Sequence, residues 1–253
     1  MKIISYNVNG VRSAINKGLI TWITSVNPDI LCLQEIKLSE TELVSSLFEA
    51  LGFHCYWYPA QKRGYSGVAI LSKQKPNNVQ YGVNKPLFDD EGRIIRADFN
   101  GFSIFSVYFP SGSSSVERQA LKMKFLEDFY VYIKEISKNF PNLIISGDVN
   151  VCHREIDIHN PKGNVNSSGF LPEERAWVGK FLDSGYIDSF RHFNQSPNNY
   201  SWWSYRAGAK QKNLGWRIDY HFVSNSLASQ LSSVAIHPDQ LMSDHCPIEI
   251  CLF

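Results

Sequence analysis

A carboxylate and an amide stand close together at the end of an apolar run in the middle of the chain. Leu143–Ile145 is apolar, Gly147 follows it, and Asp148 and Asn150 come two residues apart. In extended backbone, residues two apart project to the same side. Such a pair can bind a cation, orient a water molecule and accept a proton. The alternative is an ordinary loop after a strand, where Asp and Asn are common turn formers.

Polar side chains of the same kind end or interrupt four other apolar runs. The runs and their polar residues are Ile3–Asn9 with Asn7 and Asn9, Ile30–Glu35 with Glu35, Arg217–Phe222 with Asp219, and Leu241–Pro247 with Asp244 and His245. Each one alone is compatible with a satisfied structural group. Together they favour a functional site, because open α/β sheets gather ligands at the ends of their strands.

This set of side chains suits phosphodiester hydrolysis, which needs a polarised phosphate, an aligned water and a neutralised leaving oxygen. Glu35 is a hard oxygen ligand of the kind that Mg²⁺ prefers, while Asp148, acting as the base, would place the attacking water together with Asn150. His245 would contact the phosphate, and Asp219 would fix its tautomer and favour its charged form. The candidate metal ligands, direct or through water, are Asn7, Glu35, Asp148, Asn150, Asp244 and His245. Which group is the base and which the acid stays open.

Six short motifs occur in order between Met1 and Phe253. They are Tyr6–Gly10, Gln34–Glu35, Gly147–Asn150, Asn160–Asn164, Gly215–Tyr220 and Ser243–Pro247. This set resembles the exonuclease III family of abasic-site endonucleases, within the DNase I-like endonuclease/exonuclease/phosphatase superfamily. Glu35 and the Ser-Asp-His motif would indicate only the superfamily. The Asn-Pro-Lys-Gly-Asn and Gly-Trp-Arg-Ile-Asp-Tyr motifs narrow the resemblance to its DNA repair branch.

The resemblance implies a DNA repair nuclease that hydrolyses the phosphodiester bond 5′ to an abasic site in duplex DNA and leaves a 3′-hydroxyl. A 3′→5′ exonuclease activity and a 3′-end cleaning activity commonly accompany that reaction in the family. The implied cofactor is Mg²⁺, for which Mn²⁺ can substitute. The implied partner is duplex DNA with abasic sites or blocked 3′ ends, and we expect a monomer. Tyr108 matches the family's active-site tyrosine, although a Tyr at a strand end is otherwise usually a packing residue.

The resemblance also implies contacts to DNA. The candidate residues are Lys62, Arg63, Tyr65, Asn160, Lys162, Asn164, Trp202, Arg206, Lys210, Lys212 and Trp216. Trp216 would help form the pocket for an extruded abasic sugar, which is easiest to flip out because its base is missing. The basic loop Arg206–Leu214 would enter the minor groove. The alternatives are a solvated cationic turn at Gln61–Gly67 and ordinary surface packing of the tryptophans.

Three positions depart from the family's pattern. Asn9 stands where some members carry an Asp that binds metal, which weakens the expectation of two tight metal sites. Ser167 stands where some members have Asn at the abasic pocket. Arg206 and Ala207 stand where a pair of bulky apolar residues could act as a wedge in the DNA, so the wedge here would be a cation.

Alternating and apolar runs predict the strands that must position these residues. The predicted strands are Lys2–Tyr6, Ile30–Glu35, Phe53–Pro59, Val68–Ser72, Arg93–Phe99, Phe102–Phe109, Leu143–Ile145, Tyr200–Tyr205, Trp216–Ser224 and Ile248–Leu252. Asn100-Gly101 is a strong hairpin signal between two of them, and the turn Gln61–Gly67 joins another hairpin.

Helical spacing of apolar residues predicts the covering layers. The predicted helices are Ser13–Val26, Thr41–Leu51, one that begins at Pro172, and one with the apolar stripe Leu121, Phe125, Phe129, Ile133 and Ile136. Asn160–Gly169 is predicted to be a loop. Hairpins mixed with isolated helices favour an α/β fold of two packed mixed sheets flanked by helices. The resemblance fixes the topology as the four-layer α/β sandwich.

Composition excludes several classes of protein. The chain has 253 residues, 43% of them hydrophobic, which suits one large domain with a substantial core. The resemblance implies that residues 1–253 are a single catalytic domain. No apolar stretch approaches the roughly 20 residues of a membrane span. The chain opens on a strand rather than a signal peptide, and its five cysteines are an odd number without metal-type spacing. We therefore expect a cytoplasmic protein, nucleoid-associated if bacterial. The net charge of +1 means that DNA binding would need a local positive field.

Three other functions are compatible with parts of the pattern. A metal-dependent phosphodiesterase of the same superfamily acting on a non-DNA substrate would lack the DNA-specific motifs at Asn160–Asn164 and Trp216. A DNA-binding module without catalysis would have a broken metal or His site, and every site residue is present. A secreted nuclease would carry a signal peptide.

Overall fold

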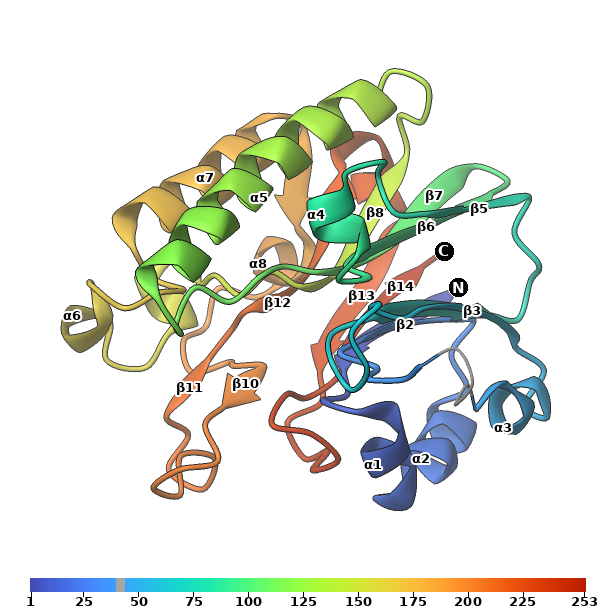
Figure 1. The fold of residues 1–253 in the computed structure, drawn as a ribbon, viewed down its shortest axis with the longest axis horizontal. Helices are drawn as coiled ribbons and strands as arrows, with labels where there is room; N and C mark the ends of the chain where they lie inside the picture. The colour runs from blue at the N-terminus through green and yellow to red at the C-terminus, as the bar shows by residue number, and fades with distance from the viewer. Residues whose placement is uncertain (40–43) are drawn as a thin grey trace.

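The chain folds into two mixed six-stranded sheets that pack face to face with helices on both outer sides (Figure 1). This computed structural model describes residues 1–39 and 44–253. The arrangement confirms the predicted four-layer sandwich. Among the described residues, no helix is both long and apolar enough to cross a membrane.

Each sheet combines one parallel pair of strands with antiparallel neighbours. The first has the order β13 (Leu231–Ile236), β14 (Ile248–Leu252), β1 (Lys2–Asn7), β2 (Ile30–Gln34), β4 (Val68–Ser72) and β3 (His54–Tyr58). The second has the order β5 (Asn78–Tyr81), β6 (Ile94–Phe99), β7 (Phe102–Tyr108), β8 (Leu143–Asp148), β12 (Asp219–Ser224) and β9 (Tyr186–Asp188). The parallel pairs are β1 with β2 and β7 with β8. Both hairpins predicted from the sequence, β3–β4 and β6–β7, are confirmed.

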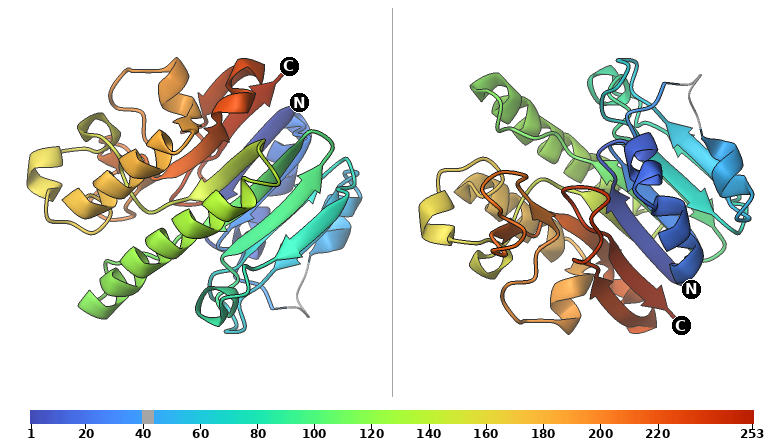
Figure 2. Two further views of the ribbon diagram at one scale, coloured as in Figure 1. Left: turned by 90° about the horizontal axis from the view of Figure 1, so that it is seen from above. Right: turned by 90° about the horizontal axis from the view of Figure 1, so that it is seen from below.

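Three apolar layers hold the sandwich together. Ile3, Ile70, Ile104 and Ile144 meet between the sheets. Helices α5 (Val116–Ile136) and α7 (Pro172–Asp183) lie side by side on the second sheet (Figure 2). Helices α1 (Val11–Asn16), α2 (Leu19–Val26) and α3 (Ser45–Glu49) cover the first sheet.

Two predicted helices differ from the observed ones. The prediction of one helix over Ser13–Val26 is wrong, because Gly18 adopts a φ of 101° and divides the segment into α1 and α2. The predicted helix Thr41–Leu51 is observed only as α3, and its beginning lies outside the described residues.

Two predicted strands near the site are shorter than expected. Only β10 (Trp202–Trp203) forms within Tyr200–Tyr205. The segment Trp216–Ser224 is divided between β11 (Gly215–Trp216), which pairs with β10, and β12. The ladder is interrupted because the backbone N–H of Arg217 donates to the carbonyl of Asp157, and the N–H of Ile218 donates to Ser201 Oγ.

Several short elements escape prediction. They are β5, β9, β13, α4 (Pro86–Asp89), α6 (Pro161–Asn164), α8 (Ser189–Phe193) and the 3-10 turns Glu155–Asp157 and Asn225–Gln230. Helix α6 lies within the predicted loop Asn160–Gly169. It forms because Pro161 occupies the first helical position and the side chain of Asn160 accepts a hydrogen bond from Gly163 N.

Candidate active site

The predicted polar residues meet at one edge of the sandwich because of how the strands run. Asn7 ends β1, Glu35 follows its parallel neighbour β2, and Asp148 ends β8. Strand β12 runs antiparallel to β8, so its first residue, Asp219, lies opposite Asp148. Tyr108 at the end of β7 is also level with Asp148. The two sheets therefore each contribute part of one site.

An open cleft of about 770 Å³ lies at this edge. Its polar floor contains Glu35, Tyr108, Asp148, Asn150, Asp244 and His245, and Trp202 and Trp216 contribute an aromatic wall. The two indoles meet edge to face with their ring centroids 6.1 Å apart. The other wall is formed by the serine-rich segment 111–115 and by the segment 166–169.

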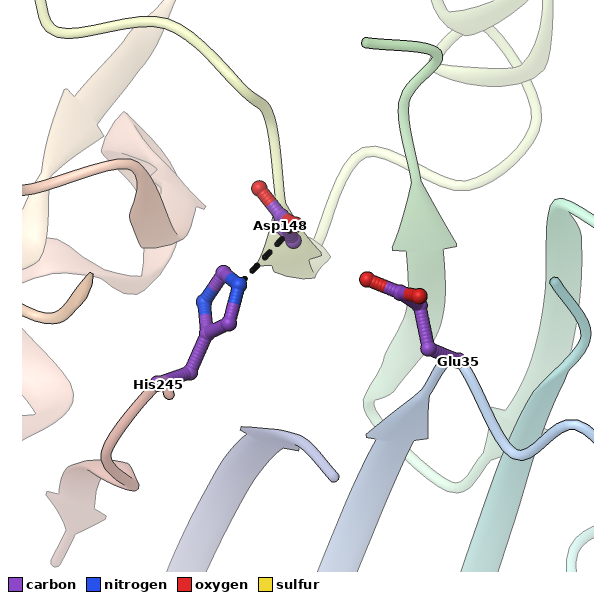
Figure 3. A group of neighbouring side chains, drawn as sticks. All are labelled: Glu35, Asp148 and His245. Atoms are coloured by element: carbon purple, nitrogen blue, oxygen red, sulfur yellow. Dashed lines mark ion pairs between the residues drawn. The ribbon is translucent and has the colours of Figure 1, made fainter. Parts of the chain in front are cut away.

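Among the described residues, Glu35 and Asp148, with His245 beside them, form the candidate metal site. Their candidate ligand atoms lie within 4.8 Å of one another, and the side chains converge from three different segments (Figure 3). Asn7 joins the two carboxylates, because its amide nitrogen donates to Glu35 Oε1 (2.9 Å) and to Asp148 Oδ2 (3.0 Å). Two carboxylates and an amide suit a hard cation such as Mg²⁺. To act as a ligand itself, Asn7 would have to turn its amide oxygen toward the ion.

His245 lies between two carboxylates. Its Nδ1 is 2.9 Å from Asp219 Oδ2, and its Nε2 is 3.7 Å from Asp148 Oδ2. Burial alone would lower the pKa of His245, but Asp219 and Asp148 outweigh burial and raise it. A charged His245 carries a proton on each ring nitrogen, so it serves as a hydrogen-bond donor and has no free lone pair for a metal.

Asp148 is buried, His245 affects its pKa, and Asn150 holds its carboxylate in place. Burial raises the pKa of Asp148, while charged His245 opposes that rise. The backbone N–H of Asn150 donates to Asp148 Oδ1 (2.8 Å), and its side-chain nitrogen donates to Asp148 Oδ2 (3.3 Å) and to Phe109 O (2.9 Å). Asn150 thus fixes the direction in which the carboxylate faces the cleft.

Asp244 lies beside the tryptophan wall rather than within the three-residue group. Its Oδ1 accepts from Asn9 Nδ2 (2.9 Å) and its Oδ2 accepts from Trp202 Nε1 (3.0 Å). Burial would raise the pKa of Asp244, but His245, Asn9 and Trp202 outweigh burial and lower it. Asp244 is therefore an anion that orients Trp202.

Tyr108 stays protonated at neutral pH and can donate a hydrogen bond into the cleft. Burial raises its pKa well above the ordinary value, and Glu35 adds to the rise. The guanidinium of Arg93 lies 4.7 Å from the ring centroid and also donates to the Tyr108 carbonyl (2.8 Å). These contacts fix the ring beside Glu35.

The predicted DNA contacts divide into two groups. Trp202 and Trp216 line the cleft, and Lys62, Arg63, Lys162, Arg206 and Lys212 are exposed, although Lys212 Nζ also donates to the Ala207 carbonyl (3.0 Å). The hydroxyl of Tyr65 instead accepts from Arg93 (3.2 Å) and Arg118 (3.1 Å).

The remaining predicted DNA contacts are occupied by bonds within the chain. Lys210 is half-buried, its Nζ donates to Gln240 O (3.1 Å), and it lies 4.6 Å from the ring centroid of Trp203. Asn160 caps α6, and Asn164 donates to the carbonyls of His159 and Asn160. Neither asparagine lines the cleft.

Among the polar residues that sequence reasoning missed, Lys37 and Ser201 contact the predicted carboxylates directly. Lys37 Nζ is 3.0 Å from Glu35 Oε2 and also donates to Asn9 Oδ1. Ser201 Oγ donates to Asp219 Oδ2 (2.6 Å). A cation two residues after Glu35 was a usable signal for Lys37, whereas nothing in the sequence distinguishes Ser201 from other serines.

The sequence of this chain matches a known protein family. Residues 4–245 match the model of the endonuclease/exonuclease/phosphatase family. The chain belongs to this family. It is 42% identical to an exodeoxyribonuclease of Bacillus subtilis, over 100% of this chain and 99% of that protein. It is 39% identical to a DNA-(apurinic or apyrimidinic site) endonuclease of Dictyostelium discoideum, over 99% of this chain and 70% of that protein.

Solved structures of the endonuclease/exonuclease/phosphatase family share this fold. A 3′ phosphatase from Neisseria, bound to a product DNA hairpin, superimposes with a TM-score of 0.93 at 28% identity, over 100% of this chain and 99% of that one. The names of these relatives confirm the resemblance to the abasic-site endonuclease branch of the family.

Proposed function

We propose that this chain is a DNA repair nuclease that hydrolyses the phosphodiester bond 5′ to abasic sites in duplex DNA and leaves a 3′-hydroxyl. A 3′→5′ exonuclease and a 3′-end cleaning activity would use the same site, and residues 1–253 would act as one catalytic domain. The observation that carries the proposal is the meeting of Glu35, Asp148 and charged His245 beneath the wall formed by Trp202 and Trp216. The names of the relatives described above all refer to DNA. They therefore give no support to the alternative of a non-DNA phosphodiesterase.

The chain's own residues supply proton transfer and charge stabilisation. Asp148 is the proposed base for the attacking water, and Asn150 orients the Asp148 carboxylate. His245, kept charged by Asp219, donates to a phosphate oxygen, where it stabilises developing negative charge. Tyr108 is the proposed second donor, to a non-bridging or leaving oxygen.

Mg²⁺ is the proposed cofactor, and Mn²⁺ can substitute. Glu35 and Asp148 would hold it, and Asn7, Asn150, Asp244 and His245 would be further ligands, direct or through water. When bound, the ion would polarise the phosphate and neutralise charge on the leaving oxygen.

DNA would be bound by the exposed cations and the tryptophan wall. We propose phosphate contacts for Lys62, Arg63, Lys162, Arg206 and Lys212 and a pocket for the abasic sugar at Trp202 and Trp216. Tyr65, Asn160, Asn164 and Lys210 would act mainly by shaping these segments, since their polar atoms are already bonded within the chain. We further propose a monomer that acts in the cytoplasm, in keeping with five free cysteines.

Incision of a duplex with one abasic-site analogue tests the proposal. With Mg²⁺, we expect a single nick 5′ to the analogue, a 3′-hydroxyl that a DNA polymerase can extend, and loss of the reaction with chelator. The variant Asp148→Asn is the control for a contaminating nuclease. Absence of incision by the wild-type chain with Mg²⁺ or Mn²⁺ would overturn the proposal.

A further inference from the structure

A fully buried ion pair lies behind the wall of the cleft that contains Gly169. Lys122 Nζ of α5 is 2.5 Å from Glu174 Oε1 of α7, and both side chains have 0% exposed surface. A buried ion pair is weak support for stability, because the cost of removing both charges from water can exceed their attraction. The other hydrogen bonds of the pair therefore indicate what it does.

Three of those hydrogen bonds lead to the two loops that line the cleft. Lys122 Nζ also donates to the carbonyl of Asn150 (2.8 Å). Glu174 Oε2 accepts from the backbone N–H groups of Gly169 (2.6 Å) and Leu171 (3.0 Å). One ion pair thus fixes the backbone of the loop after β8 and the backbone of the segment 169–171.

Gln119 connects the pair to the cleft surface. Its Nε2 donates to Glu174 Oε1 (3.0 Å), and its Oε1 accepts from Ser168 Oγ (2.7 Å). Both Gln119 and Ser168 line the cleft. Gln119 therefore separates the buried ion pair from the space that a substrate would enter.

The held backbone in turn supports both the catalytic floor and the aromatic wall. Gly169 has a φ of +95°, and a Cβ there would lie 2.9 Å from the Trp216 ring and 3.1 Å from the Asn150 carbonyl. Asn150 orients Asp148 as described above. A shift of Gly169 would move the Trp216 ring and the Asn150 loop together.

We propose that Lys122 and Glu174 are positioning residues that set the size of the pocket for the extruded sugar relative to Asp148. This inference rests on the proposed function, because it concerns how an abasic sugar is distinguished from an intact nucleotide. A pocket of fixed size favours the abasic sugar. When the pair is lost, the wall relaxes and this preference falls.

The test compares two reactions of one site: incision at an abasic analogue, and removal of intact 3′-terminal nucleotides from a duplex. The ratio of their kcat/KM values does not depend on the fraction of folded enzyme, so a merely structural role would leave it unchanged. For Glu174→Gln we expect the ratio to fall by about 10-fold, on the scale of a small misplacement in an active site.

A second variant covers the possibility that Glu174→Gln leaves Lys122 charged and unpaired and does not fold. Lys122→Met with Glu174→Gln removes both charges at similar volume, and we expect the same fall in the ratio. The control is Glu127→Gln. It removes the exposed ion pair between Glu127 Oε2 and Lys180 Nζ (2.9 Å), which joins the same two helices away from the cleft, and should leave the ratio unchanged.

The outcomes separate this inference from the proposed function. If the wild-type chain does not incise the abasic duplex, the proposed function fails. If the wild-type chain incises it and the ratio for a folded variant stays within about twofold of the wild-type ratio, well short of the expected change, only the positioning role is overturned. A fall in the ratio for the pair variants, with none for Glu127→Gln, supports the positioning role.

Discussion

Asp219 stabilises the charged form of His245 and makes few other hydrogen bonds. Its Oδ2 accepts from His245 and from Ser201, and among the described residues its buried Oδ1 has no hydrogen-bond partner. Burial disfavours the charged ring of His245, and Asp219 is the nearer of the two carboxylates, Asp219 and Asp148, that raise the pKa of His245 against it. The two residues therefore form one functional unit at the floor of the cleft.

A double-mutant cycle tests whether they act as a unit. We expect Asp219→Ala and His245→Ala each to lower kcat for abasic-site incision by roughly 10²-fold or more, the usual scale for groups that move protons. The double variant should lose much less than the product of the two losses. Losses that multiply strictly would show that the two residues act independently.

Glu35 should determine the metal requirement. Glu35→Ala removes one of the two facing carboxylates, so Lys37 and Asn7 each lose one of their two acceptors and keep Asn9 and Asp148. We expect the Mg²⁺ concentration for half-maximal activity to rise by about 10-fold or more, the scale of losing a supporting group at a metal site. An Mg²⁺ titration of incision, with circular dichroism to check the fold, measures this. Full activity of the variant at low Mg²⁺ would remove Glu35 from the metal site.

Residue types at strand ends were enough to predict most of the site, because polar groups there have few other uses. Asp148, Glu35 and His245 were predicted in this way, and the structure brings them together at the candidate site. Lys122 was not, since it lies within α5 on the face that also buries Phe125 and Phe129, and an apolar stripe gives no reason to look for an ion pair. Its partner Glu174 is distant in sequence and also reads as an ordinary first-turn acid of α7.

At the scale of elements, the short pair β10–β11 and the turn at residues 61–67 have separate tasks. The pair faces Trp202 against Trp216, whereas the turn exposes Lys62 and Arg63. The sequence predicted both tasks but overestimated the strands. The lengths of these strands depend on hydrogen bonds to side chains, such as the one from Ile218 N to Ser201 Oγ. Strand propensities of single residues do not predict such bonds.

Two substitutions should separate these tasks. Arg63→Ala should weaken binding to any duplex and reduce the slope of log K against log salt by about 0.9, because one phosphate contact is lost. Trp216→Ala should lower the preference for abasic over intact strands and leave the salt slope nearly unchanged. Binding and incision of matched duplexes over a salt series measure both. An equal loss on both substrates would make Trp216 only a structural residue.

At the scale of the whole molecule, a buried histidine joins the two sheets. His221 of β12 bonds Ser146 Oγ of β8 through Nδ1 (2.7 Å) and the Ile248 carbonyl of β14 through Nε2 (3.2 Å). Burial lowers its pKa from 6.5 to about 4. The ring is therefore neutral in the folded protein at neutral pH, donating to one sheet and accepting from the other.

This histidine should make stability depend on pH. Between pH 6.5 and about 4 the unfolded chain takes up a proton at His221 that the folded chain does not, so stability is lost as the pH falls through this window. Between pH 7 and pH 4.5 the loss should be about 2 kcal/mol, because most of the window between the two pKa values is crossed. Urea unfolding midpoints at pH 7 and pH 4.5 measure it, with His221→Asn as the comparison. An equal pH dependence in both proteins would rule out His221 as the cause.

The division of the site between the sheets has a consequence for folding. Asn7 of the first sheet bonds Asp148 of the second, and neither sheet alone contains both Glu35 and Asp148. Incision activity is therefore a kinetic probe of the docking of the two sheets. During refolding from urea, secondary structure can return before the sheets dock, but nuclease activity cannot. A stopped-flow comparison of the two signals would time docking directly, without an added label.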